Sequence, residues 1–174
     1  MGIQFETDYN METLTAMAKG LRKTVRKKRS RRVHIFAVVV LIFGLLTILA
    51  TTAGGEPTSA SGVVTLLAML VVILVSLFED KLNAWFARKR LLPGTEHAAA
   101  TFEEDGYVSA TGVTESRFSY AQIVAVAETA RYFVFALSSH HTQAYDKRTI
   151  RGGSVEDFRA FIAEKTGKLV EKIK

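Results

Sequence analysis

The sequence contains no cysteine, only two prolines and a single tryptophan among its 174 residues. The absence of cysteine is compatible with a cytoplasmic domain that needs no disulfides. Charge is also missing from two long stretches: residues 33–52 and 61–78 hold no Lys, Arg, Asp or Glu. Crossing a bilayer takes roughly 20 helical residues. Both stretches are therefore predicted to be transmembrane helices.

The net charge of +6 is unevenly distributed along the chain. Residues 1–32 carry nine Lys or Arg against three Asp or Glu, whereas residues 97–174 carry ten of each. A nucleic-acid-binding module needs its positive charge on the folded surface that docks. The neutral carboxyl-terminal part lacks this excess, so we expect no nucleic-acid partner.

The basic residues instead flank the two apolar stretches. They are Arg22, Lys23, Arg26, Lys27, Lys28, Arg29, Arg31 and Arg32 before the first, and Lys81, Arg88, Lys89 and Arg90 after the second. The connector, residues 53–60, contains no Lys or Arg, and Pro57 favours a turn. Because basic residues stay on the cytoplasmic side, this pattern predicts a membrane hairpin with both termini in the cytoplasm.

Two alternatives fit the apolar stretches less well. A cleaved signal peptide usually has an apolar run of 7–15 residues close to the amino terminus, whereas here patterned sequence precedes a longer run and a second run follows. A buried helix pair in a soluble protein would keep one polar face, but both stretches are apolar all round.

Segments beside the apolar stretches also have regular patterns. Residues 3–6 alternate as a short strand would, and apolar residues from Asp8 to about Ser30 recur at helical spacing. This basic helix either contacts anionic headgroups or packs on the protein's own domain and only sets the topology. A second helix after residue 79 places Trp85 either at the membrane interface or over the domain. Pro93 should end that helix.

From His97 the pattern changes to short strands. Asp105-Gly106 marks a hairpin, and strands rich in Val, Phe and Tyr follow up to residue 146. Ser154 and Asp157 form a capping box for a last helix, which Gly167 should end. The prediction is an α+β protein with an antiparallel sheet of about five or six strands and a carboxyl-terminal helix.

The expected organisation has six segments. They are a cytoplasmic strand and basic helix (1–32), a first transmembrane helix (33–52), an external turn (53–60), a second transmembrane helix (61–78), a juxtamembrane helix and linker (79–96) and a cytoplasmic domain (97–174). We further expect residues 3–6 to join the sheet of that domain, with Ile3 and Phe5 on one face, because an isolated strand leaves its backbone groups unpaired.

Three stretches resemble the YcxB-like family of bacterial membrane proteins. They are FEEDGYVSAT, FSYAQIVAVAETARYFVF and KRTIRGGSVEDFRAFIAEKTGK, and the order of the remaining segments is similar over nearly the whole chain. The resemblance implies a pleckstrin-homology-like fold and a place in the bacterial cell membrane, and it brings no established reaction or ligand. One or two strands of a complete pleckstrin-homology sheet are not visible in the sequence.

No residue pattern indicates catalysis or a cofactor. His140 and His141 are adjacent, so on a strand they would point to opposite faces and could not hold one ion together. The acidic residues 103–105 suit a solvated hairpin turn, and residues 165–168 suit a helix end. We expect no enzymatic activity, no metal and no cofactor.

Three functional classes remain. The first is a membrane-tethered interaction module that binds an unidentified protein partner or a second copy of itself. The second is a domain that binds lipid headgroups, for which Lys147, Arg148 and Arg151 are the candidate contacts. The third is a small transporter or channel subunit, a class that usually carries ionisable groups within its spans. Here the predicted spans contain only His34, at the edge of the first, and a few Thr and Ser residues.

Overall fold

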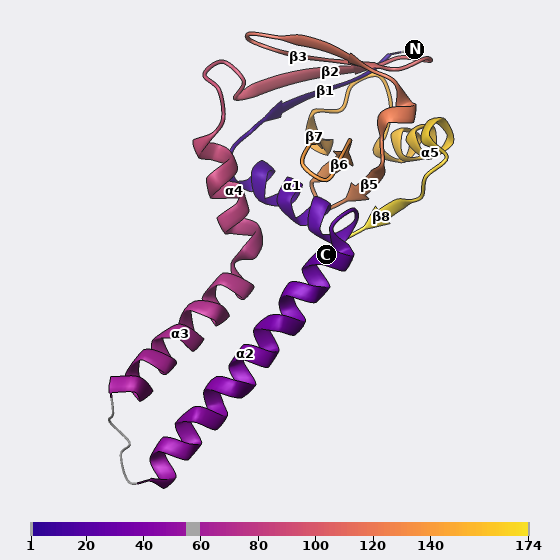
Figure 1. Cartoon of the computed structure of the whole chain (residues 1–174). Coiled ribbons are helices and arrows are strands. Elements are labelled where there is room, and N and C mark those ends of the chain that lie inside the picture. Colours follow the sequence, from indigo (N-terminus) through magenta and orange to yellow (C-terminus); the bar gives the residue numbers. More distant parts are fainter. Residues whose placement is uncertain (1, 55–59, 174) are drawn as a thin grey trace.

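The structure is a computed structural model that describes residues 2–54 and 60–173. Two long apolar helices, α2 (Lys27–Ala53) and α3 (Ala60–Leu77), extend together from a domain of two sheets and three further helices (Figure 1). We call this helix pair the apolar hairpin. Both helices are long and apolar enough to cross a bilayer. Most of the predicted external turn falls on residues 55–59, which lie outside the described residues.

The first sheet contains the amino terminus. Strand β1 (Ile3–Asp8) pairs antiparallel with β2 (His97–Phe102), and β3 (Tyr107–Thr111) and β4 (Glu115–Phe118) follow in that order. Ile3 and Phe5 are buried while Gln4 is exposed, as expected for alternating residues on a strand with one buried face. The prediction that the amino terminus joins the carboxyl-terminal domain is confirmed.

A second sheet has the order β7-β6-β5-β8. Its strands are β5 (Ala125–Glu128), β6 (Tyr132–Ala136), β7 (Thr142–Asp146) and β8 (Val170–Lys172), and β8 runs parallel to β5. The expected single sheet of five or six strands was wrong. A one-turn 3-10 helix capped by Ser119, η1 (Tyr120–Gln122), separates β4 from β5, so the strands divide into two sheets of four.

Aromatic side chains fill the space between the sheets and α5 (Val155–Thr166). Phe158 of α5 lies edge-on to Phe5 and Phe102, with ring centroids 4.7 Å and 4.8 Å away. The predicted capping box of Ser154 and Asp157 begins α5, and Gly167 ends it at a φ of 64°. The core therefore combines a residue from the extreme amino terminus with the carboxyl-terminal helix.

Helices α1 (Met11–Lys23) and α4 (Glu79–Lys89) join the domain to the apolar hairpin. We expected one helix from Asp8 to about Ser30, and this was wrong: the chain turns at residues 24–26 and α2 begins at Lys27. The Thr24 hydroxyl donates to the carbonyl of Gly20, which helps to end α1. The basic residues from Lys27 to Arg32 therefore belong to the first turns of α2.

Helix α4 packs on α1 through its one buried residue, Ala84. Its large apolar residues, Leu82, Trp85 and Phe86, remain 37–51% exposed. Trp85 thus does not cover the domain core. The helix ends at Lys89, just before the segment that contains Pro93.

Candidate functional site

Arg22 joins α1 to the start of α4. Its Nε and Nη2 atoms donate to the two carboxylate oxygens of Asp80, each over 2.6 Å, and Glu79 lies 3.8 Å from Nε. Asp80 raises the pKa of Arg22 by accepting these hydrogen bonds. A bidentate arginine–carboxylate pair fixes geometry as well as charge. This pair holds the two helices that lead into the apolar hairpin against each other.

Arg26 joins the turn before α2 to the second sheet. Its Nε donates to the carbonyl of Ser139 over 2.6 Å, and its Nη2 donates to Nδ1 of His140 over 2.9 Å. Both partners lie in the loop between β6 and β7. Arg26 therefore attaches the start of α2 to a loop of the domain that lies more than 110 residues away in the sequence.

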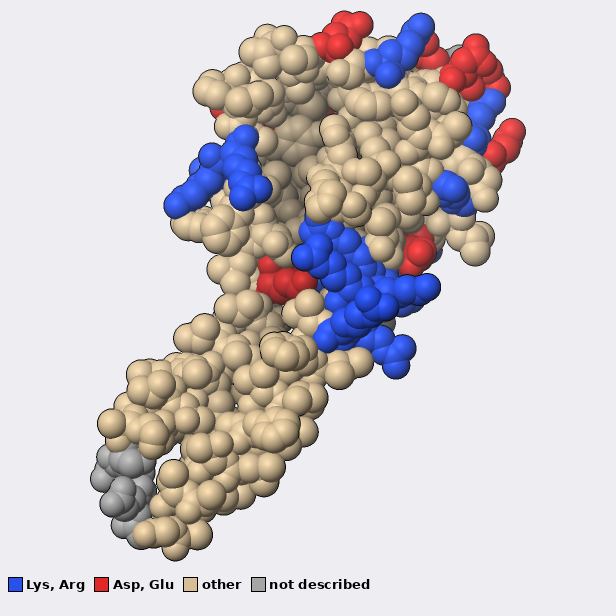
Figure 2. Space-filling model, viewed as in Figure 1, with Lys and Arg blue, Asp and Glu red and all other residues tan. Residues whose placement is uncertain are grey.

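The other basic residues before α2, in its first turns and at the end of α4 form what we call the basic belt. It consists of Lys23, Lys27, Lys28, Arg29, Arg31, Arg32, Arg88, Lys89 and Arg90. Among the described residues none of the nine has a carboxylate within ion-pair distance, and all are exposed. Figure 2 shows Lys and Arg gathered where the domain meets the apolar hairpin, whereas residues 33–53 and 60–77 of the hairpin contain no Lys, Arg, Asp or Glu.

No carboxylate of the described residues compensates the charge of the basic belt. The first turn of α2 contains no acidic residue, so its cations face the positive end of the helix dipole as well as one another. Lys89 lies over the Trp85 ring, with Nζ 3.6 Å from the centroid, which keeps an aromatic ring and a cation together on the exposed face of α4. An anionic surface or ligand would relieve this repulsion.

A cavity of about 610 Å³ opens within this region, between α1, the start of α2, α4 and the β6–β7 loop. We call it the junction cavity. Its lining includes Arg22, Arg26, Arg29, Arg90 and His140, with Glu79 as its acidic residue. Val33 of α2 and Phe86 of α4 add apolar side chains, so the cavity is lined by both cations and apolar groups.

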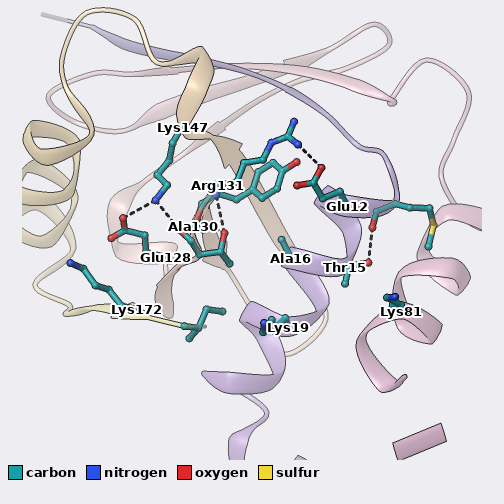
Figure 3. A pocket seen from close by; sticks show the side chains of 14 residues that line it. Glu12, Thr15, Ala16, Lys19, Lys81, Glu128, Ala130, Arg131, Lys147 and Lys172 are labelled. Atoms are coloured by element: carbon teal, nitrogen blue, oxygen red, sulfur yellow. Dashed lines mark hydrogen bonds and ion pairs between the residues drawn. The ribbon is translucent and has the colours of Figure 1, made fainter. Parts of the chain in front are cut away.

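A larger cavity of about 890 Å³ lies between α1, Lys81 of α4, the β5–β6 turn and β8. Its central charged groups engage each other: Lys147 extends to Glu128 and Arg131 to Glu12 (Figure 3). Its other lysines, Lys19, Lys81 and Lys172, come from three separate elements. This cavity carries internally paired charge at its centre, in contrast to the junction cavity.

Glu128 is the centre of the charge network beside that larger cavity. The Arg159 guanidinium donates to it over 2.7 Å and 2.8 Å, and Lys147 donates over 2.9 Å. These hydrogen bonds, Arg159 first, lower the pKa of Glu128 to about 2 against the opposing effect of burial. The network connects β5, α5 and the segment after β7, and its role is to hold the domain together.

The predicted headgroup contacts do not form a free cluster. Lys147 is paired with Glu128, Arg148 donates to Asp146 over 2.9 Å, and Arg151 lies 3.2 Å from Glu6. A phosphate at this position would have to compete with a carboxylate for each of the three cations. The arginines of the junction cavity have fewer such competitors.

The residues considered for metal binding or catalysis have other partners. His140 accepts from Arg26, whereas the ring of His141 lies 6.5 Å from that of Phe118. Glu103 pairs with Arg117 over 3.1 Å, and Glu104 pairs with Lys165. Within residues 2–54 and 60–173, no three His, Cys, Asp or Glu side chains are placed to share a metal ion.

These features define a class of protein: an α+β domain, assembled from both ends of the chain, that carries an apolar helical hairpin with a basic belt at its root. Residues 102–162 match the family described as YcxB-like protein, which confirms over that stretch the resemblance predicted from the sequence. The comparison with curated proteins gave no match, and neither did the comparison with solved structures.

Proposed function

We propose that this protein is a membrane-tethered interaction module of the bacterial cell membrane. In this proposal α2 and α3 cross the bilayer, both termini lie in the cytoplasm, and the domain binds a protein partner or a second copy at the membrane surface. The basic belt and the exposed Trp85 then lie at the cytoplasmic interface, where cations and indole rings are favoured.

One observation carries the proposal: the apolar hairpin has almost no protein around it. No residue in the most apolar part of α2 is buried, and only 6% of the corresponding part of α3 is. Apolar surface of this extent is not left in water by a monomeric soluble protein. Insertion into lipid removes it from water without requiring any further protein contact.

The pairing of β1 supports an intact amino terminus. Cleavage after the first apolar helix would remove β1, and with it the fully buried Phe5, from the aromatic core. The two four-stranded sheets closed by α5 support the pleckstrin-homology-like architecture that the resemblance implies.

Alkaline carbonate extraction of bacterial membranes tests the anchoring. The full chain should stay in the membrane pellet at high pH and enter solution only with detergent, because hydrophobic insertion is insensitive to pH. Native mass spectrometry of the detergent-solubilised protein, purified from its own membranes, should then show a stoichiometric partner or a homo-oligomer. Release by carbonate would contradict the anchoring, and a bare monomer would contradict the interaction module.

A further inference from the structure

We propose that the junction cavity binds the phosphate group of an anionic phospholipid, and that Arg26, Arg29 and Arg90 are its contacts. This inference rests on the proposed insertion of the apolar hairpin. It places headgroup recognition at the root of the hairpin, and not at Lys147, Arg148 and Arg151 on the domain.

The three arginines reach the cavity from different elements. Arg26 lies in the turn before α2, Arg29 in the first turn of α2, and Arg90 directly after α4. Guanidinium groups present several N–H donors in a plane, which suits phosphate oxygens. Because they line one cavity from separate elements, we expect their guanidinium groups to converge on one phosphate.

Arg26 is already held in position without losing its charge. Its Nε and Nη2 atoms donate to the Ser139 carbonyl and to the His140 ring, and neither partner is a carboxylate. Arg29 and Arg90 likewise have no carboxylate partner among the residues that the structure describes. Among the described residues, Arg26 thus provides a positive charge that is held in place without a carboxylate partner, as a preorganised anion site requires, and Arg29 and Arg90 add further charge without a carboxylate partner.

The junction cavity also contains one carboxylate, that of Glu79. Glu79 lies 3.8 Å from Nε of Arg22 and 3.9 Å from Nε2 of His34, and Arg22 is itself held by Asp80. Asp80 neutralises Arg22, and the other three arginines outnumber the single Glu79 carboxylate, so the cavity keeps a net positive charge.

The apolar side of the cavity identifies the source of the phosphate as a lipid. Val33 of α2 and Phe86 of α4 line the cavity together with the arginines, and both are exposed. A phosphate held by the arginines would have its acyl chains continue along α2 and α3. A free phosphate ion would gain nothing from these two residues.

The test uses the full chain, purified in a non-ionic detergent and titrated with phosphatidylglycerol, phosphatidylcholine or inorganic phosphate under native mass spectrometry. We expect one phosphatidylglycerol to be retained per chain, with weaker binding of phosphatidylcholine and of inorganic phosphate. The variant R29A/R90A should bind phosphatidylglycerol roughly 25-fold less tightly, because each cation near an anionic lipid contributes about 1 kcal/mol, or about fivefold.

The matched control is R148A/R151A, which also removes two positive charges, but from exposed arginines of the domain. This variant should bind phosphatidylglycerol as tightly as the unsubstituted protein. Three results would overturn the site: equal binding of the two lipids, unchanged binding by R29A/R90A, or loss of binding only in R148A/R151A. Inorganic phosphate binding as tightly as the lipid would overturn the lipid as the source. Carbonate extraction separates the two proposals, because a protein that stays in the membrane but shows no lipid preference refutes the site alone.

Discussion

Glu128 is a buried carboxylate whose two cationic partners come from distant parts of the chain. Its side chain is 5% exposed, and Arg159 and Lys147 both donate to it. A carboxyl group whose pKa falls from 4.5 to about 2 on folding contributes roughly 3 kcal/mol to stability at neutral pH. That contribution is present above pH 4.5 and is lost as the pH falls toward 2, because protonation removes the charge.

We therefore expect Glu128→Gln to lower the free energy of unfolding by about 3 kcal/mol at pH 7, and by less at pH 3. Thermal unfolding of the detergent-solubilised protein at both pH values measures the difference. Glu115→Gln is the matched control, since Glu115 is exposed on β4. An equal loss of unfolding free energy at pH 7 and pH 3 would show that Glu128 does not stabilise the domain through its charge.

At the scale of elements, β1 connects the two ends of the chain. Phe5 is 1% exposed and contacts Phe102, Tyr145 and Phe158, which come from β2, β7 and α5. Truncating a buried phenylalanine removes its transfer free energy and leaves a cavity. The stability of residues 97–174 should therefore depend on a residue that precedes the apolar hairpin.

Phe5→Ala should destabilise the domain by 3–5 kcal/mol, a typical cost of this substitution in a core. Gln4→Ala is the control on the same strand, because the Gln4 side chain is exposed and only its backbone pairs with Arg151; it should change stability by less than about 0.5 kcal/mol. Hydrogen exchange should also accelerate in residues 98–102 of the Phe5→Ala variant. Unchanged unfolding in Phe5→Ala would mean that β1 is dispensable to the domain.

Local signals predicted the elements that depend on local contacts. The Asp105-Gly106 turn, the Ser154–Asp157 capping box and the Gly167 cap are formed by residues a few positions apart, and all are present. The end of α1 could not be predicted in this way, because apolar spacing continues through Val25. The turn depends on Arg26, whose partners Ser139 and His140 are far away in sequence.

The second sheet also depends on contacts between distant parts of the chain, which local patterns do not predict. Strand β8 is only three residues long, and it forms because α5 returns the chain parallel to β5. The basic residues beside the apolar stretches were predicted as a topology signal. In the structure these residues have two different environments. Arg22 forms an ion pair with Asp80, whereas Arg29 and Arg90 line the junction cavity without a carboxylate partner among the described residues. This difference depends on how α1, α2 and α4 pack together, which the sequence pattern does not show.

At the scale of the whole molecule, the apolar hairpin interrupts a single domain. Because β1 and α1 precede it and the other strands follow it, the domain can form only when both ends of the hairpin emerge on the same side. Insertion and domain assembly are thus linked in the proposed arrangement. The absence of cysteine makes this testable, since any introduced thiol is unique.

Labelling of single cysteines in intact bacterial cells with a membrane-impermeant thiol reagent tests the proposed topology most directly. Ala60→Cys lies at the exposed start of α3, at the far end of the hairpin, and Leu169→Cys lies after α5, where the native side chain is 88% exposed. The proposal predicts that the first is labelled in intact cells, and that the second is labelled only after the membrane is permeabilised. Labelling of Leu169→Cys but not of Ala60→Cys in intact cells would contradict it.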